Sequence, residues 1–522
     1  MHTFFMMEYT LKSRDSHIYI KHNIFVTPNT ALFRSNLINN IICGIIRQIY
    51  NFIAKVKNGG TKMYTNFNTN SKAIIIGMTD TGEKIPAASG RISTQPGTAL
   101  EILELSKDAE KNANLISKVT RSGHTSTLEH TVFNIAFQNV SVLVEQFVIE
   151  FRLASFTVKS RRYVDFAKLG YYVPRFESKS VHDKYIAFMD YLYGEYQAFI
   201  DAGIPKEDAR FLLPYSLYSN FYCTLNAREL INMLYAMIYG RGSQYKEIKT
   251  LGESLLEQAR SMTPGIFTDF EGRRPTVQDI PTYSYKPNKE LIKQEPAVEL
   301  LCYTSEASKA VARAALIEGC NLPTAQIEEI ISDKNECVSI IEKVINSKRQ
   351  RPLEAATFTF RINNVSLSCL THFARHRIHS IGIPSLALTD RTRHILPKTI
   401  AENSNLKERY CQAFVKTAAL YEELKALGVD EETLAYIQLS GNTIDIVTTI
   451  NARELLLFMK LRSCNRAQWE IRDFAVDMLK KLREVDETIF KFYGPSCYVN
   501  KCPEGPMTCG KALEIKEFFS KL

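Results

Sequence analysis

Apolar residues recur along the chain at the spacing of helices that bury one face. Between residues 365 and 374 they predict a helix that leads into Arg375-His376-Arg377 and ends by Gly382 and Pro384. A second apolar stripe predicts a helix that carries Asn451, Arg462, Arg466 and Trp469 on its polar side. This stripe points its polar groups either into a cleft or into solvent.

The first 70 residues form a basic leader with a different pattern. Residues 37–53 place their isoleucines, leucine and phenylalanine on one side of a helix, and Lys55 and Lys57 follow. Three interpretations stay open: a membrane-surface helix, a docking helix, or an upstream extension, since Met63 precedes a well-patterned region. The sequence does not tell whether residues 1–62 belong to the mature protein.

A repeat organises the remainder of the chain. Residues 224–230 read Thr-Leu-Asn-Ala-Arg-Glu-Leu, and residues 449–455, placed 225 positions later, read Thr-Ile-Asn-Ala-Arg-Glu-Leu. The same spacing aligns Asn139-Val140-Ser141 with Asn364-Val365-Ser366. We expect two copies of one domain, over residues 71–272 and 298–522, joined by a proline-rich linker over residues 273–297.

The two copies share a framework but differ in their polar residues. Arg162, Arg210 and Arg462 align with Ala387, Ala435 and Met237, and Arg375-His376 aligns with Glu150-Phe151. Two independent sites would have kept the same polar groups. Either both sites have decayed, or each copy supplies half of a shared site.

Composition and charge narrow the class of protein. The chain has 522 residues, 45% of them hydrophobic and 23% charged, which is typical of globular domains. The net charge of +9 is concentrated in the leader, so the main body gives little support to a nucleic-acid-binding protein. No run long enough to span a membrane occurs, and eleven cysteines in this length indicate a reducing cytoplasm.

Two segments carry candidate chemistry. Arg375-His376-Arg377 suits a phosphate or a flavin carbonyl, because guanidinium groups donate paired hydrogen bonds; a solvated basic turn is the alternative. Residues 155–163 combine hydroxyls with arginines, as phosphate-binding loops do. No Gly-rich dinucleotide motif and no Walker motif occurs, so those nucleotide sites are not indicated.

Two groups of residues could bind a metal ion, and the sequence disfavours both. His372, His376 and His379 have helical spacing for one face, but the neighbouring arginines would repel a dication. Three tail cysteines, at positions 497, 502 and 509, lack a Cys-x-x-Cys spacing and would need a fourth ligand such as Cys464. We predict no metal at the main site.

These motifs resemble the flavin-dependent thymidylate synthases. The family signature, Arg-His-Arg followed after seven residues by Ser, is met by Arg375-His376-Arg377 and Ser385. The flanking motifs agree, among them residues 123–130, 155–163, 226–228, 451–453 and 467–470. The resemblance covers roughly residues 74–270 and 298–490.

The resemblance implies an α/β (α+β) fold in two tandem copies, each with a mainly antiparallel sheet flanked by helices. It implies reductive methylation of dUMP to dTMP, with methylenetetrahydrofolate as carbon donor and with FAD reduced by NADPH. Family members are homotetramers with sites between subunits, so we expect a homodimer that acts as a pseudo-tetramer, with two working sites instead of four. We expect neither nucleic acid nor, for the main body, a membrane as partner.

The resemblance also assigns roles to individual residues. Arg462 is implied as the catalytic contact to the uracil, because a fixed cation favours the ionised base. Contacts to dUMP are implied for Ser160, Arg161, Arg162, Arg210 and Arg462. Contacts to the flavin are implied for Arg375, His376, Arg377, Ser126, His124, Asn226, Arg228, Asn232, Asn451 and Arg453, with Ser93 nearby.

The sequence departs from the family pattern at several positions. The family Glu before the signature Ser is missing from both copies, and a family Gln is Phe147 in one copy and His372 in the other. A catalytically silent flavin- or nucleotide-binding protein of the same fold is therefore the alternative to an active enzyme. A nucleic-acid-binding protein that uses the arginine clusters is the third hypothesis.

Overall fold

The structure is a computed structural model that describes residues 5–13, 16–24, 71–166, 168–278, 280–281, 283, 285 and 296–522. The chain divides into two compact units, Met1–Met63 and Tyr64–Leu522. The described part of the first unit is an antiparallel hairpin of β1 (Phe5–Ser13) and β2 (Ser16–Ile24). The amphipathic helix expected at residues 37–53 lies outside the described residues.

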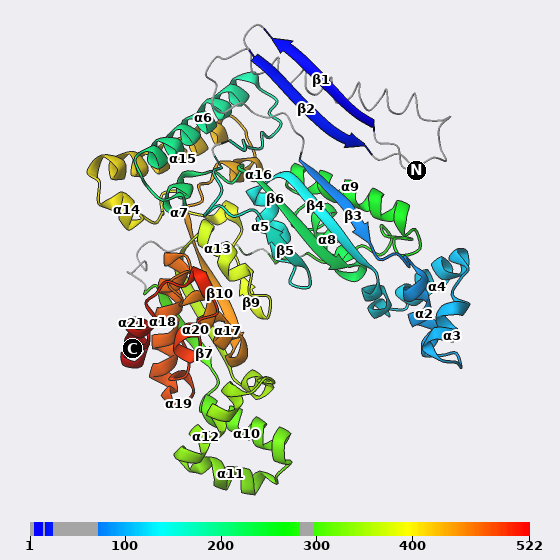
Figure 1. The fold of residues 1–522 in the computed structure, drawn as a ribbon, viewed down its shortest axis with the longest axis vertical. Coiled ribbons are helices and arrows are strands. Elements are labelled where there is room, and N and C mark those ends of the chain that lie inside the picture. Colours follow the sequence, from blue (N-terminus) through cyan, green and yellow to red (C-terminus); the bar gives the residue numbers. More distant parts are fainter. Residues whose placement is uncertain are drawn as a thin grey trace. The chain divides into compact units, whose positions relative to one another are not determined.

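The second unit contains two four-stranded antiparallel sheets of the same strand order (Figure 1). One sheet has the order β3-β4-β6-β5 and the other β7-β8-β10-β9. Their bounds are β3 (Lys72–Met78), β4 (Val132–Ser141), β5 (Ser155–Val158) and β6 (Tyr218–Asn226), then β7 (Val298–Tyr303), β8 (Thr357–Ser366), β9 (His379–Gly382) and β10 (Thr443–Asn451). The expected α/β fold with two tandem, mainly antiparallel sheets is confirmed.

The repeat reaches the level of strand register. Val132 pairs with Asn226 in the first sheet, and Thr357 pairs with Asn451, 225 positions later, in the second. Asn139 and Asn364 both have positive φ angles, of 50° and 59°. Asparagine tolerates this left-handed conformation better than most residues, so the aligned Asn marks a kink that both copies need.

Helices flank each sheet. The first copy has α2 (Lys84–Ile92), α3 (Ala99–Leu105), α4 (Ala109–Arg121), α5 (Val142–Ile149), α6 (Lys179–Asp201), α7 (Lys206–Ala209), α8 (Ala227–Ile238) and α9 (Lys246–Met262). The second copy has α10 (Ala307–Cys320), α11 (Thr324–Ser332), α12 (Lys334–Asn346), α13 (Leu367–Ala374), α14 (Lys398–Ala401), α15 (Ser404–Ala426), α16 (Glu431–Leu434), α17 (Ala452–Arg462), α18 (Trp469–Val485), α19 (Glu487–Phe490), α20 (Ser496–Val499) and α21 (Ala512–Lys521).

The two copies join through reciprocal main-chain hydrogen bonds. Tyr215 N donates to Gln438 O at 2.8 Å, and Ser440 N donates to Leu213 O at 2.9 Å. The long helices α6 and α15 also contact each other, and Lys184 pairs with Glu423 across them at 2.5 Å. The two main-chain bonds are equivalent under the 225-residue spacing, as in an interface between two copies related by a twofold axis.

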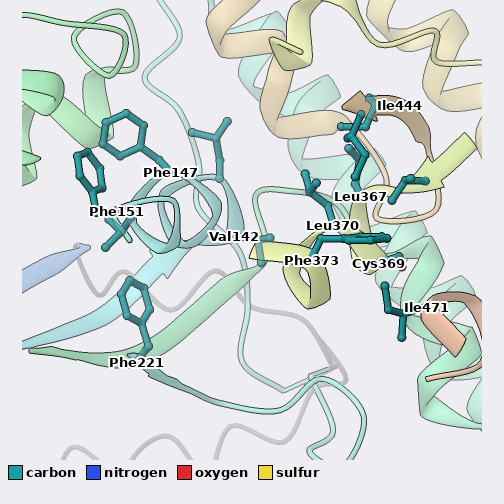
Figure 2. Packing of buried hydrophobic residues seen from close by; sticks show 14 of the residues in the cluster. Val142, Phe147, Phe151, Phe221, Leu367, Cys369, Leu370, Phe373, Ile444 and Ile471 are labelled. Carbon is teal, nitrogen blue, oxygen red and sulfur yellow. The ribbon is translucent and has the colours of Figure 1, made fainter. Parts of the chain in front are cut away.

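Apolar side chains from both copies form one continuous buried core. Figure 2 shows part of it, with Phe147 and Phe151 of the first copy and Leu370 and Phe373 of the second. The described residues of the predicted linker, 273–278, 280–281, 283, 285 and 296–297, carry no helix or strand. Among the described residues, no helix is both long and apolar enough to cross a membrane.

Candidate active site

Two short buried helices, α5 and α13, contact each other at the centre of the second unit. Each begins at a serine whose hydroxyl accepts a hydrogen bond from the helix: Ser141 from Val144 N at 3.2 Å, and Ser366 from Cys369 N at 2.9 Å. Their C-cap residues are Glu150 and Arg375, respectively. The copies therefore place opposite charges at equivalent helix ends.

The charges of four arginines, two from each copy, act on His372 of α13. Arg162 and Arg210 come from the first copy, and Arg375 and Arg462 come from the second. Burial first, and then these four positive charges, hold the pKa of His372 well below its usual value. We call these five residues the cationic pocket.

The cationic pocket contains polar atoms without protein partners. His372 is 6% exposed, and neither of its ring nitrogens has a hydrogen-bond partner. Arg210 is 4% exposed, and its Nη2 is likewise unpartnered. Burial, followed by the charge of Arg161, lowers the pKa of Arg210 to about 10. Buried polar groups normally have partners, so an anion with several acceptors fits this pocket.

The loop after β5 supplies Ser160, Arg161 and Arg162 to different partners. Arg161 makes a bidentate ion pair with buried Glu145 at 2.8 and 2.9 Å, which leaves few of its donors for a ligand. Arg162 pairs with Glu207 and donates from Nη1 to the carbonyl of Arg466 at 3.2 Å. Half-buried Ser160 lies beside them. Arg162 thus reaches the second copy within one chain.

Arg462 ends α17 and is held by a buried chain of hydrogen bonds. Its Nε donates to His376 Nε2 at 2.9 Å, and His376 Nδ1 lies 2.8 Å from Glu454 Oε1. Burial, with the neighbouring Arg375 charge, lowers the pKa of Arg462 to about 10. Burial also lowers the pKa of His376.

Trp469 of the second copy and Asp208 of the first form a hydrogen bond between the copies. Trp469 Nε1 donates to Asp208 Oδ1 at 2.8 Å, and Thr399 Oγ1 donates to Asp208 Oδ2 at 2.7 Å. The stripe predicted on one helix was wrong in this respect: α17 ends at Arg462, Arg466 lies in the turn, and Trp469 begins α18. The turn brings Arg466 to Arg162, which a continuous helix would not do.

The equivalent place in the first copy has lost its free cations. Phe147 stands where His372 stands in the second copy, and Arg241 covers its ring at 4.6 Å. Arg241 also pairs with Glu150 at 2.8 Å. Phe151 packs on Phe147 with ring centroids 5.6 Å apart. We call these four residues the counterpart site.

A cavity of about 330 Å³ lies between the copies on the side of the counterpart site. It contains Glu432 and Tyr436, which align with Glu207 and Phe211. Arg175 and Lys246 face Asp430 and Glu432 in its wall, so its charges balance. This cavity lacks the excess of positive charge that marks the cationic pocket.

Several residues implied as flavin contacts hold the local structure in both copies. Asn226 and Asn451 begin α8 and α17, and each side chain accepts a hydrogen bond at 2.9 Å from the backbone N–H three residues on. Arg228 pairs with Glu129 at 2.6 Å, and Arg453 pairs with Glu354. Capping and ion pairing explain why this repeat was so clear in the sequence.

The remaining implied contacts are more exposed. Asn232 donates to Glu229 Oε2 at 3.3 Å, and Arg377 donates to the carbonyl of Ala154 at 2.6 Å. His124 and Ser126, like Ser93, lie at the surface of the first copy. The structure describes no contact that joins these three residues to the cationic pocket. Their proposed roles stay predictions.

The arrangement of the histidines differs from the expected helical face. α13 ends at Ala374, and His379 lies in β9. His379 Nδ1 contacts Thr448 Oγ1 at 2.8 Å. Both ring nitrogens of His376 are hydrogen-bonded, one to Glu454 and the other to Arg462. Within the described part of the chain, no three His, Cys, Asp or Glu side chains are placed to hold a metal ion.

The sequence interpretation missed three acids of the site. Glu145, Asp208 and Glu454 position Arg161, Trp469 and His376, respectively. Glu145 and Asp208 align with Leu370 and Thr433, so a search for acids present in only one copy would have found them. Glu454 is present in both copies as part of the repeat and gave no such signal.

The residues present fit a flavin together with a nucleotide. Guanidinium groups and unpartnered buried nitrogens match the phosphates and carbonyl oxygens of such ligands. Exposed Arg375 and Arg377 leave donors at the outer edge of the pocket.

Comparisons with known proteins agree on one family. A sequence model described as thymidylate synthase complementing protein matches twice, over residues 75–265 and 299–487. The flavin-dependent thymidylate synthase of Geobacter sulfurreducens is 34% identical over 229 residues, which is 43% of this chain and 98% of that protein. The enzyme of the same name from Clostridium tetani is 32% identical over 242 residues, 42% of this chain and 96% of that protein. Each relative therefore corresponds to a single copy.

Among solved structures, a UMP/dUMP methylase PolB from Streptomyces cacaoi, bound with 5-Br dUMP, is 24% identical with a TM-score of 0.35. The match covers 40% of this chain and 100% of that chain.

Proposed function

Because the chain belongs to the flavin-dependent thymidylate synthase family, in two tandem copies, we propose that it methylates dUMP to dTMP in the cationic pocket. Methylenetetrahydrofolate is the carbon donor in this proposal. A bound FAD, reduced by NADPH, supplies the hydride. The protein binds and orients the reactants and stabilises charge.

The observation that carries the proposal is the composition of the cationic pocket. Arg162 and Arg210 of one copy meet Arg375 and Arg462 of the other around unpartnered His372. These four guanidinium groups, of which Arg210 is buried, repel each other, and an anionic ligand relieves that repulsion. A nucleoside monophosphate brings both the charge and the carbonyl oxygens that these donors need.

Each cation has a place in the proposal. Arg462 contacts the uracil and favours its ionised form, which makes the base a better nucleophile for the new carbon bond. Arg162 and Arg210, with Ser160 and the Arg161 loop, hold the phosphate. His372, neutral in this setting, offers one donor and one acceptor to the nucleotide.

The flavin side of the proposal rests on the two Asn-Ala-Arg segments and the signature arginines. Arg375 and Arg377 keep exposed donors, and Arg228 and Arg453 stand at equivalent surfaces of the two copies. We propose that they bind the cofactor together with Ser126, His124 and the two capping asparagines. Only one cationic pocket exists per chain among the described residues, because the counterpart site has lost its free cations.

A homodimer would complete the assembly. Both sheets expose large apolar side chains, including Ile76 and Tyr222 in the first and Leu301 and Tyr303 in the second, each between 48% and 62% exposed. Such faces favour burial against a second copy. We propose a pseudo-tetramer with two working sites. All ten described cysteines are free thiols, which fits a cytoplasmic location.

One set of measurements tests the function. The purified chain should be yellow, should change its visible spectrum with dUMP, and should form dTMP with methylenetetrahydrofolate and NADPH. R162A and R462A should each lower the turnover rate by at least about a hundredfold. Binding without turnover in the wild type would support the catalytically silent alternative. A colourless chain that does not bind added FAD would contradict both.

A further inference from the structure

A buried carboxylate, an imidazole and a guanidinium form a chain behind the cationic pocket. Glu454 Oε1 lies 2.8 Å from His376 Nδ1, and Arg462 Nε lies 2.9 Å from His376 Nε2. Glu454 and His376 are 7% and 4% exposed. The first and last members lie on α17, and His376 follows α13, so the chain joins two helices.

The hydrogen bonds among Glu454, His376 and Arg462 permit a single protonation state of His376. Arginine stays protonated in proteins and its Nε–H can only donate, so His376 Nε2 must accept. The proton of the neutral imidazole is therefore on Nδ1 and is donated to Glu454. A proton on Nε2 would face the Arg462 N–H and break that hydrogen bond.

The first copy has the equivalent glutamate but lacks the hydrogen-bonded histidine and arginine. Glu229 aligns with Glu454, but Phe151 and Met237 take the places of His376 and Arg462. Glu229 instead accepts from Leu153 N at 3.4 Å and from Asn232 Nδ2 at 3.3 Å. The complete set of hydrogen bonds therefore occurs only in the second copy, which has Arg462.

The Arg462 side chain needs a fixed hydrogen-bond partner because neighbouring arginines repel it. The charges of Arg375 and Arg162 act on its guanidinium, and an unrestrained side chain would turn toward solvent. A neutral acceptor fixed by a carboxylate restrains Arg462 without neutralising its charge. The remaining N–H groups of Arg462 then stay available for a ligand.

We propose that Glu454 is a positioning residue that acts through His376 to aim the Arg462 guanidinium at the pyrimidine. This inference rests on the proposed function, since it assumes that Arg462 contacts the base. It also gives His376 a role beyond the flavin contact implied by the family resemblance. The charged and titratable groups that face His376 are Glu454 and Arg462 on α17 and His379 on β9.

The test compares E454A, E454Q and the matched control E229A in the flavin-loaded full chain. We expect E454A to lower kcat/KM for dUMP about tenfold to a hundredfold, the range for a lost orienting partner. Gln can still accept from Nδ1, so E454Q should recover most of this loss. E229A should leave the KM for dUMP and the acid limb of the pH profile unchanged.

The pH profile separates positioning from folding. The Glu454 charge favours the protonated imidazole, so E454Q should move the acid limb of the profile to lower pH. A purely structural role predicts an equal loss of kcat/KM at every pH. That outcome, or wild-type kinetics for E454A, would overturn the inference while wild-type dTMP formation leaves the proposed function intact.

Equilibrium binding of dUMP provides a second readout if wild-type turnover is absent. E454A should then bind dUMP more weakly than both the wild type and E229A, and equal affinities would refute the positioning role. A wild type that neither binds nor methylates dUMP would refute the proposed function itself.

Discussion

The cationic pocket and the counterpart site occupy equivalent places in two copies of one fold. They differ in whether their polar side chains have partners within the protein. The counterpart site pairs Arg241 with Glu150 and fills its centre with Phe147 and Phe151. The cationic pocket leaves Arg210 and His372 with unpartnered atoms. The counterpart site is complete without a ligand, whereas the cationic pocket is not.

This difference shows what a duplication allows. A buried cation without a partner lowers stability, and a fold tolerates it where a ligand supplies the missing charge. Once one pocket per chain is sufficient, the other can replace its cations with apolar groups at no cost to ligand binding. Met237, Ala387 and Ala435 are such replacements. Asymmetry between the copies therefore locates the site better than either copy alone.

The largest expected effect removes the cation that distinguishes the two places most directly. R462A should lower kcat at least a hundredfold to a thousandfold, the range for one preorganised electrostatic donor. The measurement is single-turnover dTMP formation with saturating dUMP. R241A, at the counterpart site, is the control and should retain activity within about twofold, so a similar loss in both variants would break the comparison.

The buried ion pair of Arg161 with Glu145 offers a test of stability. Their equivalents in the second copy are Leu386 and Leu370. E145Q should lower the free energy of unfolding by about 3–5 kcal/mol, because it leaves Arg161 buried and unpaired. The double variant E145L/R161L should recover most of that loss in urea unfolding. A double variant as unstable as E145Q would show that the copies are not interchangeable here.

Glu470 links stability to pH. Burial raises its pKa to about 7, although Ser366 donates to it from N and Oγ at 2.7 and 2.6 Å. The folded protein therefore holds this proton more strongly than the unfolded chain does, and stability falls as pH rises from about 4.5 to about 7. The contribution is at most about 3 kcal/mol.

E470Q should reduce the loss of stability between pH 5 and pH 8, measured as the difference between the urea midpoints at the two pH values. E247Q tests the equivalent acid of the first copy, which also accepts a serine N–H, from Ser141 at 3.0 Å. An unchanged slope in E470Q would show that the carboxyl is already ionised in the folded protein at pH 5.

The smallest expected effect exchanges the central residue of the cationic pocket. H372F introduces the counterpart residue and should weaken dUMP binding about tenfold to a hundredfold, because buried donors and acceptors are lost. H372Q keeps hydrogen-bonding capacity and should weaken it less. Equilibrium dialysis measures both, and equal affinities for H372F and the wild type would show that His372 does not face the nucleotide.

Much of the fold followed from the sequence because the repeat is local and strong. The shared Asn-Ala-Arg-Glu-Leu segment combines a helix cap, an ion-pairing arginine and a buried acid, which all act within a few residues. The two sheets and their flanking helices were expected from the family resemblance. The hairpin of β1 and β2 had no counterpart in that resemblance.

The arginine cluster of the candidate site could be predicted where a residue differs between the copies. Arg162, Arg210 and Arg462 were identified in this way, and the structure brings their charges to His372. The sequence did not tell whether the halves would meet within a chain or between chains. Nor did the expected stripe of Asn451, Arg462, Arg466 and Trp469 show that Arg466 lies between two helices, although residues 463–468, Ser-Cys-Asn-Arg-Ala-Gln, contain few apolar side chains.

The reciprocal main-chain bonds between residues 211–216 and 436–441 have a consequence for how the enzyme behaves on dilution. Separate subunits find each other at a rate set by their abundance, but tethered halves meet in a unimolecular step. The two halves of the cationic pocket are therefore present in equal number as soon as the chain is made, even in a cell that makes very few copies.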